Sequence, residues 1–215
     1  MGIVQIGSVS GVGQDVTAGG AAKVDTRQAV SLVTEGSYRM GVTTGDMAAG
    51  LAAAAPILEF RNANTAKSCI LHSVSVCAAS NGTGFAAGIA FFNLFKLRTH
   101  TVIATGGGAV AMTTAMGRQQ STQSDPGALI QLSATAALTI GSGATADTNA
   151  VAQAGPFTVG TATLTNFTLG VANLYTAGEF PLILAPNEGF TIRATVPATG
   201  VWVGKINLHW SEVTV

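Results

Sequence analysis

The side chains able to perform acid–base, metal-binding or nucleophilic chemistry are few in this sequence and widely spaced. The three histidines, His72, His100 and His209, lie in no His-x-His or His-Glu-x-x-His pattern, and the two cysteines form no Cys-x-x-Cys pair. Metal sites and covalent catalysis need several such groups to converge. The sequence therefore predicts no metal, no cofactor and no catalytic residue, and we expect that the protein is not an enzyme.

His72 and His209 differ in their predicted surroundings. His72 alternates with Ile70, Val74 and Val76, which places it on the apolar face of a predicted strand. It could act as a base or a ligand, but a hydrogen-bonded histidine in a core or an interface is the more common case. His209 is predicted on the polar face of the last strand.

Cys69 and Cys77 are expected on one face of the same strand, eight residues apart. At about 3.3 Å per residue they are separated by about 26 Å, which is beyond the reach of a disulfide. We interpret them as two small buried hydrophobic residues, as suits a reducing cytoplasm. An intermolecular disulfide is the alternative.

Two pairs of opposite charges lie at strand ends. Glu188 and Arg193 bracket the end of a turn, and Glu59 and Arg61 flank the end of a predicted strand. They form either ion pairs between subunits, which set the register of neighbours, or solvated charges that contribute little. The sequence leaves both interpretations open.

The composition predicts an assembled protein. Charged residues make up only 9% of the chain, whereas 47% of the residues are hydrophobic. An average soluble domain carries about 25% charged residues, which hydrate its surface and keep its copies apart. We therefore expect other protein to cover much of this surface. The lack of a basic run argues against nucleic acid as a partner, and no apolar run reaches the roughly 20 residues of a membrane span.

The hydrophobic pattern has a period of two, which is typical of strands. Residues 201–213 place Trp202, Ile206, Leu208 and Trp210 on one face, and residues 190–196 alternate in the same way. With residues 180–184 these segments are predicted to form a three-stranded meander. Upstream, residues 57–61 and 68–78 are predicted strands, and the Asn-Gly pair at 81–82 predicts a hairpin turn into an apolar segment at 85–95.

Many short strands with Gly-rich turns predict an all-β protein, an antiparallel β-sandwich or jelly roll with an extended N-terminal arm. We expect the arm over residues 1–45 and one domain over 46–215, with loop insertions at about 106–123 and 141–155. The arm is expected to add a strand to a neighbour's sheet. Subunit-interface contacts are predicted for Val24, Leu32, Tyr38, Phe91, Phe92, Phe95, Glu188 and Arg193.

Four blocks of the sequence resemble a family of virion structural proteins of tailed bacteriophages. They are residues 24–32 with 36–39, residues 47–61, residues 85–92 and residues 181–200. The likeness spans about 24–98 and 176–213. It implies a virion subunit that is assembled in the bacterial host cytoplasm and whose partners are the major capsid protein and further copies of itself. A capsid cement or decoration protein fits best, and a tail, baseplate or fibre component with a host-binding role is the alternative.

Overall fold

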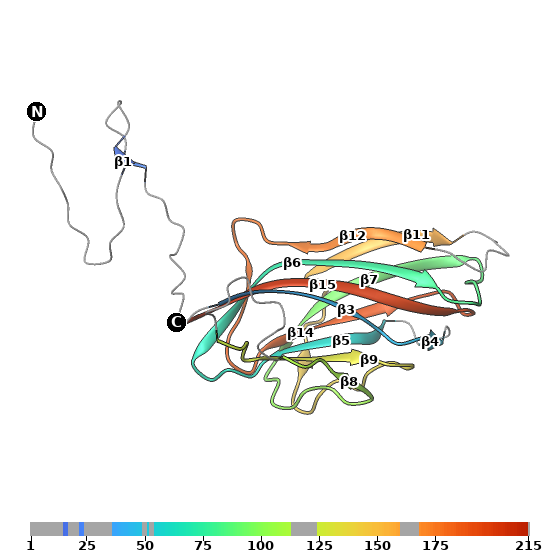
Figure 1. Ribbon diagram of the computed structural model, residues 1–215, viewed down its shortest axis with the longest axis horizontal. Helices are drawn as coiled ribbons and strands as arrows, with labels where there is room; N and C mark the ends of the chain where they lie inside the picture. The colour runs from blue at the N-terminus through green and yellow to red at the C-terminus, as the bar shows by residue number, and fades with distance from the viewer. Residues whose placement is uncertain are drawn as a thin grey trace, which may run out of the picture. The chain divides into compact units, whose positions relative to one another are not determined.

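The computed structural model describes residues 36–48, 51, 54–112, 124–159 and 168–214, together with the backbone of two short strands near the N-terminus. The chain divides into two units, Met1–Val30 and Ser31–Val215. In the first unit, β1 (Asp15–Val16) and β2 (Ala22–Lys23) pair with each other. In the second unit two antiparallel sheets pack face to face (Figure 1). The predicted all-β sandwich is thus confirmed, and the described residues include no helix.

The strands of the second unit are long near the middle of the sheets and short at their edges. In chain order they are β3 (Gly36–Thr43), β4 (Met47–Ala48), β5 (Ala55–Asn62), β6 (Lys67–Ser80), β7 (Gly88–Arg98), β8 (Gly107–Ala109), β9 (Ala128–Ser133), β10 (Thr145–Ala146), β11 (Ala152–Val159), β12 (Thr168–Thr176), β13 (Leu182–Leu184), β14 (Gly189–Thr195) and β15 (Val201–Thr214).

The strand order is that of a jelly roll. The six-stranded sheet has the order β12-β6-β15-β3, with β13 beside β6 and β4 beside β15. The seven-stranded sheet has the order β10-β7-β14-β5-β9-β8, with β11 also beside β7. If β3, β5, β6, β7, β11, β12, β14 and β15 are numbered one to eight, the sheets read 1-8-3-6 and 2-7-4-5. These orders are two interleaved Greek keys, which confirms the predicted jelly roll.

Aromatic side chains from both sheets form the centre of the core. Phe60 of β5 stacks on Phe190 of β14, with ring centroids 4.9 Å apart, and meets Trp210 of β15 edge to face at 5.4 Å. Tyr38 of β3 lies 5.4 Å from the Trp210 ring. Each such buried side chain contributes about 1.5–3 kcal/mol through burial alone. The core therefore joins strands that are far apart in the sequence.

The alternation in β15 was predicted correctly, but the meander was not. Trp202, Ile206, Leu208 and Trp210 are all buried. However, β13 pairs with β6, β14 pairs with β5 and β7, and β15 pairs with β6 and β3. Consecutive strands therefore alternate between the sheets, because each short turn crosses from one sheet to the other.

The hairpin expected at 81–82 is wrong for the same reason. Gly82 has the positive φ (77°) that favours glycine in a turn. Yet β6 belongs to the six-stranded sheet and β7 to the seven-stranded sheet. Residues 81–87 consequently connect the two sheets and do not close a hairpin.

A β-bulge at His72 changes which residues of β6 face the core. His209 pairs with Ser73 while Trp210 pairs with Leu71, so His72 is an extra residue on β6. Cys69 before the bulge is buried, and Cys77 after it is only half-buried. The prediction that the two cysteines share a face is therefore wrong, and so is the placement of His72 on the apolar face. Both cysteines are free.

The predicted arm and insertions also need correction. Residues Gly36–Thr43, expected within the arm, form β3 and pair along their whole length with β15. Strand β8 lies within the insertion expected at 106–123. Strand β10 and the start of β11 lie within the one expected at 141–155. The predicted interface residues Val24 and Leu32 lie outside the described residues.

Candidate functional site

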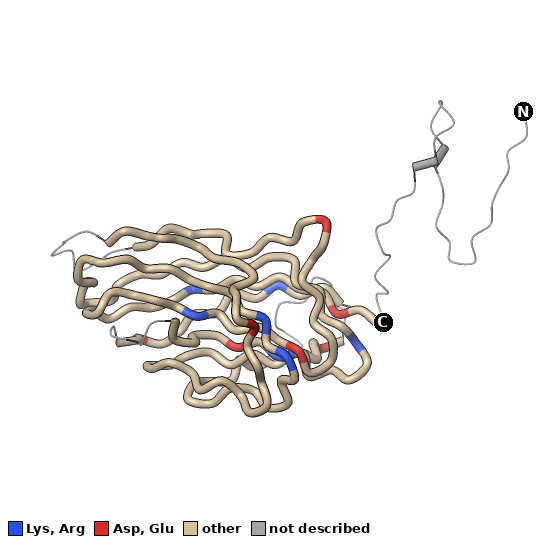
Figure 2. Tube along the Cα trace, turned by 180° about the vertical axis from the view of Figure 1, so that it is seen from behind, with Lys and Arg blue, Asp and Glu red and all other residues tan. Residues whose placement is uncertain are grey.

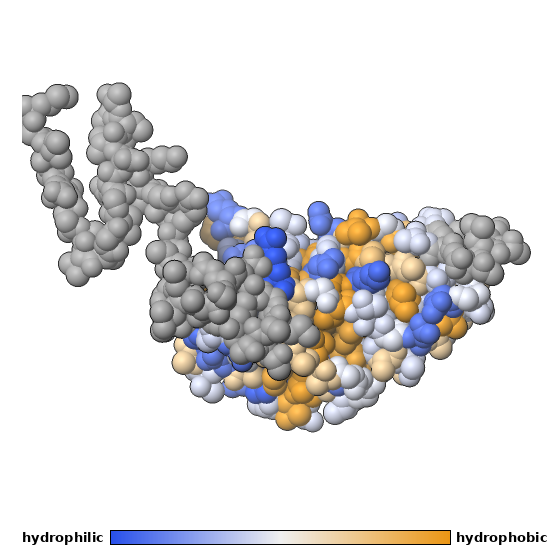
Figure 3. Space-filling view, viewed as in Figure 1, coloured by the Kyte–Doolittle hydropathy of each residue, from blue (hydrophilic) through white to orange (hydrophobic). Residues whose placement is uncertain are grey.

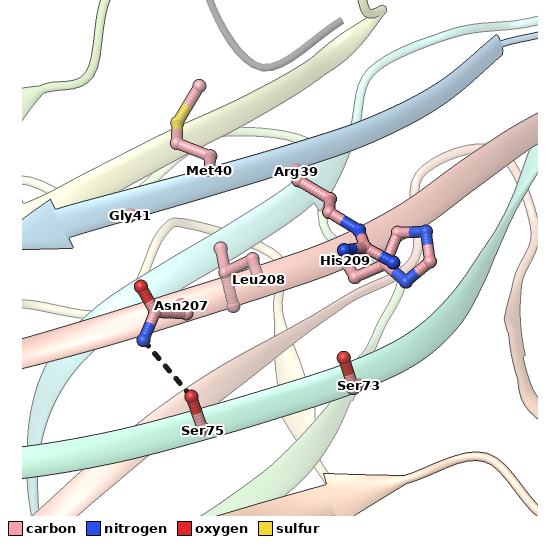
Figure 4. A pocket seen from close by; sticks show the side chains of 8 residues that line it. All are labelled: Arg39, Met40, Gly41, Ser73, Ser75, Asn207, Leu208 and His209. Atoms are coloured by element: carbon pink, nitrogen blue, oxygen red, sulfur yellow. Dashed lines mark hydrogen bonds between the residues drawn. The ribbon is translucent and has the colours of Figure 1, made fainter. Parts of the chain in front are cut away.

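A polar surface depression lies on the outer face of the six-stranded sheet, where β3, β15 and β6 run side by side (Figure 4). It is a shallow hollow of about 370 Å³. Its lining residues are Arg39, Met40, Gly41, Ser73, Ser75, Asn207, Leu208 and His209. We call this depression the Arg39 hollow.

The floor of the Arg39 hollow is low because its central side chains are small. Gly41 has no side chain, and a Cβ atom there would lie 2.9 Å from Oδ1 of Asn207. Asn207 donates a hydrogen bond from Nδ2 to Oγ of Ser75 at 3.1 Å. This bond fixes the amide along one wall, while Arg39 and His209 form the other (Figure 4).

Two histidines meet beside the hollow, at the bulge in β6. The rings of His72 and His209 have centroids 4.6 Å apart. Each ring shares a hydrogen bond with a serine hydroxyl: His72 Nε2 lies 2.9 Å from Ser211 Oγ, and His209 Nε2 lies 3.2 Å from Ser37 Oγ. At the bulge, His72 and Ser73 of β6 both lie between the buried residues Leu71 and Val74, so His72 lies on the outer face beside His209.

Arg39 supplies the positive charge of the hollow at neutral pH. Partial burial, followed by the charges of His72 and Arg39, lowers the pKa of His209 to about 4. Burial, followed by the charge of Arg39, also lowers the pKa of His72. Both rings are thus neutral near pH 7. Arg39 is exposed and has no ion-pair partner among the residues that the structure describes.

The serine–histidine pairs resemble half of a nucleophilic triad, but their surroundings favour a structural role. The Ser211 hydroxyl is buried, at 4% exposure, so a substrate could not reach it. No carboxylate within the described ranges hydrogen-bonds to either ring, as the third member of a triad would. The hollow is instead suited to binding, because it combines an exposed guanidinium with an amide and hydroxyls.

No metal centre is found in the described part of the chain, where no three His, Cys, Asp or Glu side chains come together. Nor does that part contain a helix with the length and hydropathy to cross a bilayer.

Glu59, expected at an interface or in solvent, is fully buried within the subunit. Its Oε1 accepts hydrogen bonds from His100 Nε2 at 2.7 Å and from the Ala104 amide at 2.5 Å, and its Oε2 accepts one from the Gly141 amide at 3.3 Å. These bonds hold two connecting segments against the outer face of the seven-stranded sheet. Arg61 donates to the carbonyl of His100 and to Oδ1 of Asn187. The charged groups of Glu59 and Arg61 are therefore both hydrogen-bonded within the subunit.

Four further predicted interface residues are also engaged within the subunit. Tyr38 and Phe92 are 0% and 1% exposed, so their side chains are in the core and not available to a neighbour. Glu188 forms an ion pair with Lys96 at 2.8 Å. Burial lowers the pKa of Arg193, and its guanidinium lies 4.6 Å above the ring of Phe95.

Phe91 and Phe95 are half-buried, which leaves part of each ring accessible. The Arg39 hollow could not be predicted from the sequence, because the pairing of Arg39 with His209 joins residues 170 positions apart. The strand pattern of 201–213 contained one signal, since it correctly placed His209 on the outer face.

No family model, no curated protein and no solved structure matches this chain.

Proposed function

We propose that this chain is a non-catalytic virion structural subunit, which attaches to a capsid lattice as a homo-oligomer and stabilises the lattice. The observation that carries the proposal is the distribution of charge. Most carboxylates of the described residues are buried or form ion pairs within the subunit, while large apolar side chains remain exposed. Such a surface gains free energy by associating with protein and loses little charge hydration in doing so.

The buried or paired carboxylates are distributed over both sheets. Glu59 and Glu212 are 0% exposed, and Glu212 accepts hydrogen bonds from the amides of Gly127 and Ala128. Asp147 pairs with Arg98 at 2.6 Å, as Glu188 does with Lys96. Figure 2 shows long uncharged stretches of the sandwich, with the charged residues gathered mainly toward the end where β15 terminates.

Exposed apolar side chains complement this lack of charge. Figure 3 shows hydrophobic residues between the polar ones on one face of the molecule. In the described ranges, the large hydrophobic residues that are at least 40% exposed are Ile89, Val102, Leu129, Val151, Val171, Phe180 and Ile183. They lie on several elements, which suits a subunit with more than one protein neighbour, as a lattice-bound oligomer would have.

The jelly-roll topology and the resemblance to tailed-phage virion proteins support a place on the capsid surface. We propose the major capsid protein and a second copy of this chain as partners, with assembly in the host cytoplasm.

Reconstitution tests the proposal. Purified chain is added to phage heads that lack it, and occupancy is measured by quantitative mass spectrometry with heat release of DNA as the readout of stabilisation. Saturable binding at hundreds of copies per head supports the proposal. Binding of a handful of copies, at a tail structure, would favour the tail or fibre role instead.

A further inference from the structure

The loop at residues 178–181, between β12 and β13, presents an aromatic side chain to solvent. Phe180 is 88% exposed, the largest exposure of any large hydrophobic residue in the described part of the chain. Its neighbour Glu179 is also exposed and has no ion-pair partner there. In Figure 1 this loop (orange) stands beyond the end of β12, at a corner of the sandwich.

Hydrogen bonds at its base hold the loop in place. The Ala177 amide donates to the carbonyl of His72 at 2.7 Å, and the Leu182 amide donates to the Tyr175 hydroxyl at 2.6 Å. The two bonds flank the loop on either side. A braced loop loses little conformational entropy on binding, so an exposed aromatic residue there is a preorganised anchor.

The Arg39 hollow has the complementary properties. It offers an exposed guanidinium without an ion-pair partner in the described residues, hydrogen-bonding groups from Ser75 and Asn207, and a floor without bulky side chains. Its volume of about 370 Å³ is at the lower end of the range for small-ligand pockets. This space can take one aromatic ring with an adjacent carboxylate.

We propose that the 178–181 loop of one copy binds in the Arg39 hollow of a second copy, with Glu179 paired to Arg39 and Phe180 on the floor. The exposure of Phe180 shows that it does not fill the hollow of its own subunit. Charge complementarity selects the occupant, because neither the Glu179 carboxylate nor the Arg39 guanidinium has an ion-pair partner among the residues that the structure describes. A two-fold dimer contains this contact twice, and a head-to-tail ring contains it once per interface.

This contact would provide the self-association assumed in the proposed function, on which the inference rests. Exposed aromatic anchors and desolvated arginines are frequent hot spots of protein interfaces. We therefore expect Phe180→Ala to weaken self-association about 30-fold or more. Arg39→Glu and Glu179→Arg should each weaken it at least about tenfold, because each places like charges opposite one another.

The test is sedimentation equilibrium of the full chain and of four variants: Phe180→Ala, Arg39→Glu, Glu179→Arg and the double charge swap. Lys205→Glu is the matched control, since Lys205 is exposed on β15 of the same sheet but does not line the hollow. The double swap should restore the dissociation constant to within about threefold of the parent, as a reversed ion pair would. The control should change it by less than about threefold.

A parent chain that stays monomeric, a double swap that fails to recover, or Phe180→Ala that associates normally would each overturn the inference. If Arg39→Glu does not fold, Phe180→Ala and Glu179→Arg, both in an exposed loop, decide the question. Capsid occupancy is measured in parallel. If the parent chain occupies capsids and its variants self-associate normally, the inference is refuted and the proposed function stands. If the variants lose self-association and the parent chain does not occupy capsids, the proposed function is refuted and the inference stands.

Discussion

Oε1 of Glu59 lies 2.7 Å from Nε2 of His100, and neither side chain has any exposure to solvent. The same carboxylate accepts the Ala104 and Gly141 amides, so one residue of β5 joins two segments that have no regular secondary structure where they meet it. A buried charge with good partners is neutral or modestly stabilising, but removing the charge leaves its partners unsatisfied.

Glu59→Ala should therefore lower the free energy of unfolding by about 3–5 kcal/mol, because two buried amides and an imidazole lose their acceptor. Urea denaturation measures this change. The control is Glu179→Ala, an exposed carboxylate without these contacts, which should change stability by less than about 0.5 kcal/mol. Equal stability of the two variants would show that Glu59 does not hold the segments in place.

Glu212→Gln should loosen the segment that precedes β9. Both carboxylate oxygens of Glu212 accept backbone amides, those of Gly127 and Ala128, at 3.0 and 3.1 Å. Glutamine offers one acceptor and turns its NH₂ group toward the other amide, so we expect a loss of about 1–3 kcal/mol. Hydrogen exchange at these two amides should accelerate, whereas exchange in β14 should follow only the global change.

Acidification should destabilise the protein through His209. Its pKa is about 4 in the folded chain and 6.5 without the fold. Between these values the unfolded chain binds more protons, so stability falls as the pH drops from about 6.5 to about 4. Because the ring is largely solvated, we expect a contribution of only about 1 kcal/mol, well below the full linkage value.

The contribution of His209 is measured by urea denaturation of the parent and of His209→Gln, each at pH 7 and pH 4.5. The parent should lose more stability than the variant over this interval. Equal losses in the two proteins would contradict the assigned pKa.

The two cysteines should react at very different rates. Cys69 is buried, and burial, followed by the nearby charge of Glu212, raises the pKa of its thiol. Cys77 is half-buried on the outer side of β6. Iodoacetamide should label Cys77 in the native protein and Cys69 only after unfolding, because the thiolate is the reactive form. Mass spectrometry of peptides after timed labelling checks this order, and preferential labelling of Cys69 would contradict the bulge at His72.

Removing residues 1–30 should leave the sandwich folded, since the second unit begins at Ser31. If the N-terminal segment adds a strand to a neighbour, as we expect from the sequence, the truncated chain should lose capsid occupancy. Circular dichroism and capsid binding measure the two effects separately. Full occupancy by the truncated chain would show that the segment is not needed for attachment.

The sequence was most informative where one strand is buried on one face. The alternation around Trp202 and Trp210 predicts β15, its inward face and the half-buried character of the sheet, because the period of two is set by backbone geometry. Several such segments together predict the fold class. They do not predict which sheet each strand joins, because a turn such as 197–200 can close a hairpin or cross between sheets with the same residues.

The candidate site depends on features that local patterns do not contain. The bulge at His72 inserts one residue without any change in composition, so the alternation that points Val74 and Val76 inward does not extend to His72, which lies on the outer face beside His209. Glu59 appears at a strand end in the sequence and is buried only because segments 45 and 82 residues further along cover it. In both residues, contacts between segments that are distant in the sequence determine where the side chain lies.

We propose that a capsid lattice and further copies of the chain cover this weakly charged exterior. The decisive measurement is the number of copies of this protein per purified virion, counted by mass spectrometry against labelled peptide standards. We expect hundreds of copies, retained on tailless heads. Complete absence from the particle, or a few copies that leave with the tail, would contradict this proposal.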